Sequence, residues 1–321
     1  MNYKGIIPIL PTPFDAQELI DFEDLHRLVD FAIQADVNAI GVPAFGSEFY
    51  KLSGGERGEL ISTVIKHVDG RKPVIVQCNH TAPNVVADMA RDAESQGASA
   101  INVALPRAFP CSDNQLLNFA QTVCKSVSLP VILQDWNPGG PTIGIEFVKA
   151  LHASCPNFRY IKYEEPGIAK LIREIDIATQ GLVKTFTGWG GTHMLELIPC
   201  GSVAVMPGFS LIDYFQKIWN SLANQQMEEA YRLFARILPY ISFSLQNLEQ
   251  FHHVEKQLLK RRGLLKSATV RSVTIEILPD TQSYLDLILD QTLTALEEEG
   301  IACYQGDEIQ DSKIVNKSID I

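Results

Sequence analysis

Lys162 stands at the end of a short apolar run, residues 158–162 (FRYIK), and Glu164 follows it. A lysine buried at a strand end favours its neutral amine, which attacks carbonyl carbons. A Schiff base on such a lysine turns a 2-keto acid into an electron sink, as aldol cleavage and dehydration require. An extended strand would place Glu164 on the same face as Lys162, where it could polarise the amine or act as a base. A surface lysine is the structural alternative.

A second pair of polar residues, Gln134 and Asp135, ends another apolar run. A carboxylate near Lys162 could take a proton from C3 of an imine or deliver one to a leaving hydroxyl. We therefore predict Asp135 as an acid–base group, with Gln134 binding substrate or orienting water. The alternative for Asp135 is a turn former before the Asn-Pro pair that follows.

Further candidates lie in segments that follow apolar runs. Ser47 and the amide of Gly46 could bind a carboxylate, although serine is also a common helix N-cap. His80 could bind a substrate hydroxyl or act as an acid. Gly188 and Trp189 belong to a glycine-rich loop that could bind a carboxylate through its amides and form one wall of the pocket.

Other polar residues are predicted to be structural. Glu48 is expected to bind loop amides beneath the site. His252 and His253 lie beside Lys256 and Lys260 and are expected to form a solvated face or a helix contact rather than a metal site. No cluster has metal-ligand spacing, and a Schiff-base enzyme needs neither metal nor cofactor.

Composition restricts the partners and the compartment. A formal net charge of −11 argues against nucleic acid and anionic membranes as partners. No apolar run approaches the roughly 20 residues of a membrane span. The six cysteines lack paired spacing and indicate reduced thiols. The N-terminus leads directly into an apolar run, so we expect no signal peptide and a cytoplasmic protein.

The arrangement that must position these residues is an alternation of apolar runs with stretches of helical length. Runs that are apolar on both faces predict buried parallel strands. The predicted strands are 5–11, 39–44, 73–78, 100–105, 130–134, 158–162, 183–187 and 202–206. The predicted helices are 21–35, 55–68, 84–96, 113–126, 144–154, 167–178, 191–199 and 209–223. Eight such units predict a (β/α)8 TIM barrel over residues 1–225. The alternative, an open doubly wound sheet, lacks its glycine fingerprint.

A C-terminal helical appendage is predicted for residues 226–299. Its helices are expected at 227–247, 249–262 and 281–299, with Gly263 and Pro279 as stops. Residues 300–321 are predicted to form a polar tail. An apolar stripe on the first of these helices is expected to cover more than its own barrel; it comprises Tyr231, Phe234, Ile237, Leu238 and Ile241.

Several segments, in this order, resemble the dihydrodipicolinate synthase/N-acetylneuraminate lyase superfamily of class I aldolases and dehydratases. The resemblance covers roughly residues 3–299. The matching segments are 5–14 (GIIPILPTPF), 45–57 (FGSEFYKLSGGER), 129–135 (LPVILQD), 161–162 (IK), Gly188 and 201–205 (GSVAV). The resemblance implies that Lys162 forms the imine, that a small keto acid is the partner, and that the protein is a homo-oligomer, a dimer or a tetramer.

Departures from the family pattern bear on the substrate. The pyruvate-binding threonine pair is replaced at 44–48 (AFGSE), and Gln134 stands where the family has a catalytic tyrosine. No arginine occurs in 139–142 (GGPT), and 106–109 (PRAF) lacks the synthase's tyrosine pair. The sequence resembles instead a sugar-acid branch, that of L-2-keto-3-deoxyarabonate dehydratase.

Three functions remain open from the sequence. The first is a Schiff-base lyase, dehydratase or aldolase, for a 2-keto-3-deoxy sugar acid or a related 2-keto acid. The second is a carbon–carbon synthase that joins pyruvate to an aldehyde through the same enamine. The third is a non-catalytic barrel of the same family, for which the retained Lys162 and its carboxylates would have no use.

Overall fold

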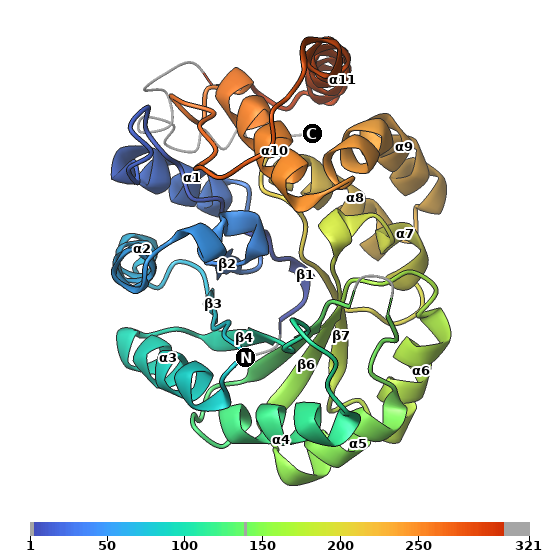
Figure 1. The fold of residues 1–321 in the computed structure, drawn as a ribbon. Coiled ribbons are helices and arrows are strands. Elements are labelled where there is room, and N and C mark those ends of the chain that lie inside the picture. Colours follow the sequence, from blue (N-terminus) through green and yellow to red (C-terminus); the bar gives the residue numbers. More distant parts are fainter. Residues whose placement is uncertain (1–2, 138–139, 305–321) are drawn as a thin grey trace.

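The computed structural model describes residues 3–137 and 140–304 and shows a parallel sheet of eight strands surrounded by helices (Figure 1). The strands are β1 (Gly5–Ile6), β2 (Ile40–Val42), β3 (Val74–Gln77), β4 (Ala100–Ala104), β5 (Val131–Asp135), β6 (Phe158–Tyr163), β7 (Lys184–Thr187) and β8 (Ala204–Val205). Their order, β1-β8-β7-β6-β5-β4-β3-β2, places β1 and β2 at the two edges. Ile9 forms a parallel bridge with Gly41, which joins these edges and closes the barrel. The predicted (β/α)8 fold is therefore confirmed.

The barrel has two apolar layers because its strands are buried on both faces. Tyr160 and Phe186 belong to an interior cluster, whereas Ile161 packs outward against the helices. Successive residues of a strand point to opposite faces, so each strand contributes to both layers. This alternation decides which polar side chains at the strand ends enter the barrel mouth.

Helices follow the strands and cover the outside of the barrel (Figure 1). They are α1 (Phe22–Gln34), α2 (Gly54–Val68), α3 (Pro83–Gln96), α4 (Asp113–Cys124), α5 (Ile145–Ser154), α6 (Ala169–Ala178), α7 (Met194–Leu197) and α8 (Ile212–Ala223). Short 3-10 helices occupy two of the loops: η1 (Phe45–Ser47) and η2 (Phe49–Lys51) after β2, and η3 (Trp189–Gly191) after β7. Ser53 starts α2 with a capping box that includes Glu56, which fixes where the loop after β2 ends.

The C-terminal region forms three more helices, α9 (Met227–Ser244), α10 (Leu248–Arg261) and α11 (Pro279–Glu298). Pro279 begins α11 rather than stopping a helix, because proline suits the first turn, where an N–H has no helical partner. The predicted stripe on α9 is divided. Its residues Phe234, Ile237 and Ile241 are buried in one cluster, while Tyr231 and Leu238 are exposed. The boundary at residue 226 stays a prediction, and most of the predicted tail, 305–321, lies outside the described residues.

Within the described part of the chain, no helix is long and apolar enough to cross a membrane. The six cysteines, all of them described, are free thiols.

Candidate active site

Lys162 lies on the inward face near the end of β6 and is only 5% exposed. Its Nζ is 2.8 Å from Oε1 of Glu164. They are two positions apart in the sequence, so the strand alternation directs both side chains into the barrel mouth. A buried amine with one close carboxylate is an arrangement that can form an imine and move a proton beside it.

Glu164 is held by three donors. Besides Lys162, its Oε1 accepts a hydrogen bond of 2.6 Å from Nε2 of Gln134, and its Oε2 accepts one from the backbone N–H of Trp189. Gly188 makes this possible, because a Cβ at that position would overlap Oε2 of Glu164. Gly188, which the sequence predicted to bind substrate, is therefore required to be small so that Glu164 fits beside it. The amide of the next residue, Trp189, is already bonded to Glu164.

Gln134 connects this pair to the barrel interior. Its side-chain carbonyl accepts a hydrogen bond of 2.7 Å from Nε2 of Gln77 on β3. Both carboxamides are almost completely buried. Gln134 is thus fixed as a donor to Glu164, in the place where the sequence resemblance expects a tyrosine hydroxyl. Gln77 was not among the sequence candidates, although its inward position on β3 follows from strand alternation.

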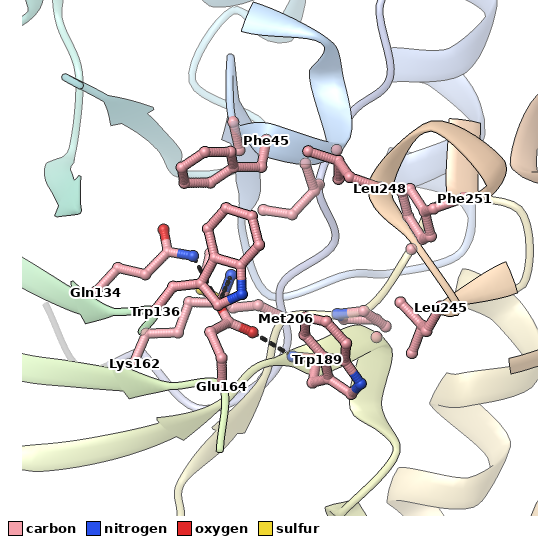
Figure 2. A pocket seen from close by; sticks show the side chains of 16 residues that line it. Phe45, Gln134, Trp136, Lys162, Glu164, Trp189, Met206, Leu245, Leu248 and Phe251 are labelled. Atoms are coloured by element: carbon pink, nitrogen blue, oxygen red, sulfur yellow. Dashed lines mark hydrogen bonds and ion pairs between the residues drawn. The ribbon is translucent and has the colours of Figure 1, made fainter. Parts of the chain in front are cut away.

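A pocket surrounds Lys162, and its empty space is about 550 Å³ including its open mouth. Figure 2 shows Lys162 and Glu164 beneath a set of aromatic and aliphatic side chains. The larger apolar side chains are Phe45, Trp136, Trp189, Met206, Leu245, Leu248 and Phe251. Of these, only Trp189 was a sequence candidate. Gly46 also lines the pocket, as do Ile9 and the segment 206–208.

Two glycines allow side chains of the C-terminal region to enter the pocket. Phe251 of α10 packs on Gly46, where an added Cβ would lie 3.2 Å from its ring. Leu245, which follows α9, packs on Gly190, where an added Cβ would lie 2.8 Å from Cδ1. The α9–α10 corner therefore forms one wall of the pocket rather than a separate layer (Figure 2).

Buried Glu255 attaches α10 to the loop after β8. Its carboxylate accepts hydrogen bonds from the amides of Phe209 and Ser210, at 2.7 and 2.9 Å, and from the hydroxyl of Tyr240 at 2.7 Å. Burial raises the pKa of Glu255, while these donors oppose the rise. Gly208 has to be small here, since an added Cβ would lie 2.5 Å from Oε1 of Glu255.

Glu48 attaches α10 to the loop after β2. Its carboxylate is 2.5 Å from Nζ of Lys256 and 3.0 Å from Nζ of Lys51, and it accepts a hydrogen bond from the amide of Arg271. Burial would raise the pKa of Glu48, but the neighbouring Lys256, His252 and Lys51 lower it overall. Burial lowers the pKa of Lys256 to about 8 against the opposing attraction of Glu48. Glu48 is structural, and its main partners are lysines rather than loop amides.

The structure does not bring Asp135 into the pocket. Its register partner is Tyr163, whereas Gln134 pairs with Lys162, so Asp135 points to the opposite face of the sheet. There its carboxylate accepts hydrogen bonds of 2.7 Å from the guanidinium of Arg107 and 2.7 Å from the amide of Ile143. These contacts hold two loops together, which favours the structural interpretation of Asp135.

Ser47 and His80 also lie away from Lys162. Ser47 is completely buried; its hydroxyl donates to the carbonyl of Leu10 at 2.5 Å and accepts from the amide of Ala44 at 2.9 Å. His80 is exposed and lines a second hollow with Arg107, on the other side of Phe45 and Trp136. Neither residue belongs to the Lys162 pocket as described.

Two alternatives were predicted for this face of α10, a solvated face and a helix contact. His252 and Lys256 are both about 1% exposed, so the structure favours the contact. Nε2 of His252 lies 3.0 Å from the hydroxyl of Tyr50. Among the described residues, no group of three histidine, cysteine or acidic side chains is placed to hold a metal ion.

Comparisons with known proteins agree with this fold. A model of the dihydrodipicolinate synthetase family matches residues 2–292. The chain is 26% identical to the L-2-keto-3-deoxyarabonate dehydratase of Azospirillum brasilense over 288 residues, 88% of this chain and 93% of that protein. It is 31% identical to the 4-hydroxy-tetrahydrodipicolinate synthase of Caldicellulosiruptor bescii over 251 residues, 74% of this chain and 81% of that protein. The structure of the 4-hydroxy-tetrahydrodipicolinate synthase of Methylacidiphilum fumariolicum superposes with a TM-score of 0.85 at 20% identity, covering 92% of this chain and 98% of that one.

Proposed function

The chain belongs to the dihydrodipicolinate synthetase family, and from this premise we propose that it is a Schiff-base lyase for a 4-hydroxy-2-keto acid. This is the chemical class that includes the 2-keto-3-deoxy sugar acids. The observation that carries the proposal is the buried Lys162 with Glu164 at 2.8 Å, at the floor of a pocket in the barrel mouth. Barrel enzymes place their chemistry at this end of the strands.

In the proposed reaction, the neutral amine of Lys162 attacks C2 of the keto acid, and loss of water gives an iminium ion. The iminium withdraws electrons from C3. For dehydration, Glu164 takes a proton from C3, and the resulting enamine expels the C4 hydroxyl, which leaves as water with the proton that Glu164 returns. For aldol cleavage, Glu164 takes the proton of the C4 hydroxyl, the C3–C4 bond breaks, an aldehyde leaves, and the protonated Glu164 then gives its proton to C3 of the enamine. In both reactions water hydrolyses the iminium ion, which releases the product and restores Lys162.

Glu164 is the acid–base group that the geometry supports best. It is the carboxylate that lines the pocket and touches the amine, whereas Asp135 is occupied on the opposite face. Gln134 has no ionisable proton and acts by holding Oε1 of Glu164 at 2.6 Å. We therefore assign the proton transfers to Glu164 and a positioning role to Gln134.

The names of the relatives support a lyase without fixing its substrate. One is a keto-deoxy sugar-acid dehydratase and another is a 4-hydroxy-tetrahydrodipicolinate synthase. The condensation of pyruvate with an aldehyde is the reverse of the aldol cleavage and uses the same groups, so it stays the second candidate. The absence of an arginine from 139–142 disfavours aspartate semialdehyde as that aldehyde.

Borohydride trapping tests the imine. The protein is incubated with pyruvate, reduced, and its intact mass is measured; we expect a gain of one reduced pyruvate. Lys162→Ala should remain folded and gain nothing, because its side chain faces the pocket rather than the packed core. Lys170→Ala, which removes an exposed lysine outside the pocket, serves as the control and should still gain the adduct. An adduct on Lys162→Ala would exclude Lys162 as the reacting amine. The absence of an adduct on the wild type would exclude the proposed reaction and favour the alternative of a non-catalytic barrel.

A further inference from the structure

We propose that the substrate carries an apolar substituent, alkyl or aryl, on C4 instead of the hydroxylated tail of a sugar acid. The inference rests on the proposed function and narrows its substrate class. It comes from the composition of the pocket walls that would surround the substrate beyond C4, when C2 is bonded to Lys162.

The polar side chains of the pocket are already engaged with one another. Lys162 and Gln134 both contact Oε1 of Glu164, and Trp189 donates its amide to Oε2. In the proposed reaction, Lys162 is bonded to C2, and Glu164 transfers protons at C3 and at the C4 hydroxyl. They are therefore not free to bind hydroxyls at C5 or C6.

Two further polar side-chain groups are found in the pocket lining, the indole N–H groups of Trp136 and Trp189. That of Trp136 is buried and has no acceptor among the described residues. Each indole can donate to one acceptor, and the carboxylate that every 2-keto acid carries is the strongest acceptor present. A polyhydroxy tail would need several partners in addition.

The walls beyond these groups are apolar and come from four separate segments. Phe45 follows β2, Trp136 follows β5, Met206 follows β8, and Leu245 and Leu248 flank the α9–α10 corner. Phe45 and Trp136 meet edge to face, with ring centroids 4.5 Å apart. Such walls favour apolar groups by removing their surface from water, and they leave buried hydroxyls without partners.

A polar alternative exists on the far side of Phe45 and Trp136. The second hollow there contains Arg107 and Asn79, whose Nε and Nδ2 atoms are buried and have no acceptor in the described part of the chain. A hydroxylated tail that passed Trp136 into this hollow would reach these donors. This route makes a distinct prediction, because it would depend on Arg107.

The test compares three acids that share the 4-hydroxy-2-keto unit. 4-Hydroxy-2-oxohexanoate and 2-keto-3-deoxygluconate have the same number of carbons and differ in the hydroxyls of C5 and C6; 4-hydroxy-2-oxo-4-phenylbutanoate adds an aryl group. Borohydride trapping at a series of concentrations gives the half-saturating concentration of each acid, whichever bond is later broken. Product formation, followed by mass spectrometry, gives relative kcat/KM. We expect the two apolar acids to exceed 2-keto-3-deoxygluconate by about 10²-fold, the scale of discrimination by a hydrophobic pocket.

Leu248→Asn tests the wall itself. Leu248 is half-buried at the first turn of α10, and the substitution should reduce the preference by about tenfold, a part of the discrimination that a hydrophobic pocket provides. Leu287→Asn, on the exposed face of α11, is the matched control and should leave the preference unchanged. A melting temperature and pyruvate trapping for both variants show that each is folded and forms the imine.

The outcomes separate the two proposals. A pyruvate adduct together with equal or better use of 2-keto-3-deoxygluconate would overturn the inference of an apolar substituent and leave the proposed function standing. Loss of activity on 2-keto-3-deoxygluconate in Arg107→Met would then place the tail in the second hollow. No pyruvate adduct on the wild type overturns the proposed function and this inference with it. A preference for the apolar acids that Leu248→Asn weakens and Leu287→Asn retains supports the inference.

Discussion

Glu164→Gln should separate imine formation from the steps that follow it. Glutamine keeps the shape of Glu164 but cannot take a proton, and its amide would face the donors Gln134 and Trp189. It also removes the carboxylate charge 2.8 Å from Nζ of Lys162 but leaves the amine itself in place to attack the keto acid. We expect pyruvate trapping to survive while turnover falls by about 10²–10⁴-fold, the usual contribution of a general acid–base group.

Asp135→Asn is the matched control, because it makes the same chemical change at the adjacent-strand carboxylate that faces away from the pocket. Asparagine can still accept from the amide of Ile143 through its carbonyl oxygen, but it loses the charge beside Arg107. Weakening this buried contact should lower the free energy of unfolding by about 1–3 kcal/mol. Turnover should stay close to wild type.

The assay is a comparison of both variants with the wild type by trapping, single-turnover kinetics and urea unfolding. If Glu164→Gln keeps full turnover while Asp135→Asn loses it at unchanged stability, the acid–base assignment is refuted. That result would mean that the proton passes through Asp135, as the sequence alone suggested. Loss of pyruvate trapping in a folded Glu164→Gln would instead show that Glu164 is needed to form the imine.

Three further outcomes are expected. Condensation of pyruvate with aspartate semialdehyde should be undetectable in a coupled reductase assay, because residues 139–142 provide no arginine; turnover of about 1 per second or more would contradict this. Burial lowers the pKa of His252 to about 4, below its value of 6.5 when unfolded. Between pH 6.5 and pH 4 the unfolded state therefore binds a proton that the folded state does not, so the free energy of unfolding decreases as the pH falls through this range. From pH 7 to pH 5, the wild type should therefore lose about 2 kcal/mol more unfolding free energy than His252→Asn, and parallel losses in urea titrations would refute this. Sedimentation should find a homo-oligomer, since Tyr231 and Leu238 leave apolar area exposed on α9; a monomer at micromolar concentration would count against it.

Local patterns were sufficient to predict the barrel and the central pair of the site. The strands are apolar on both faces, so their positions could be read from short runs. Lys162 and Glu164 belong to one strand, and their shared face follows from its two-residue period alone. No long-range information was needed for either prediction.

The interpretation of Asp135 required information that a single strand does not contain. Gln134 and Asp135 are adjacent, so one of them must face inward and the other outward. Which one does so depends on the register between β5 and β6, where Gln134 pairs with Lys162. A shift of one residue would exchange their faces, and a sequence without its pairing partners does not fix that register.

The apolar walls were missed for a related reason. Leu245, Leu248 and Phe251 look in the sequence like an ordinary helical stripe, and about 80 residues separate them from Lys162. They reach the pocket because Glu48 binds Lys256 and Glu255 binds the loop after β8. These buried contacts join residues far apart in the chain, so the charge pattern alone did not decide between a solvated face and a helix contact for His252 and Lys256. The same contacts place one part of the apolar wall, Leu245, Leu248 and Phe251, in the C-terminal region, whereas Lys162 belongs to the barrel. A substitution such as Leu248→Asn should accordingly change which acid is used and leave the chemistry of Lys162 intact.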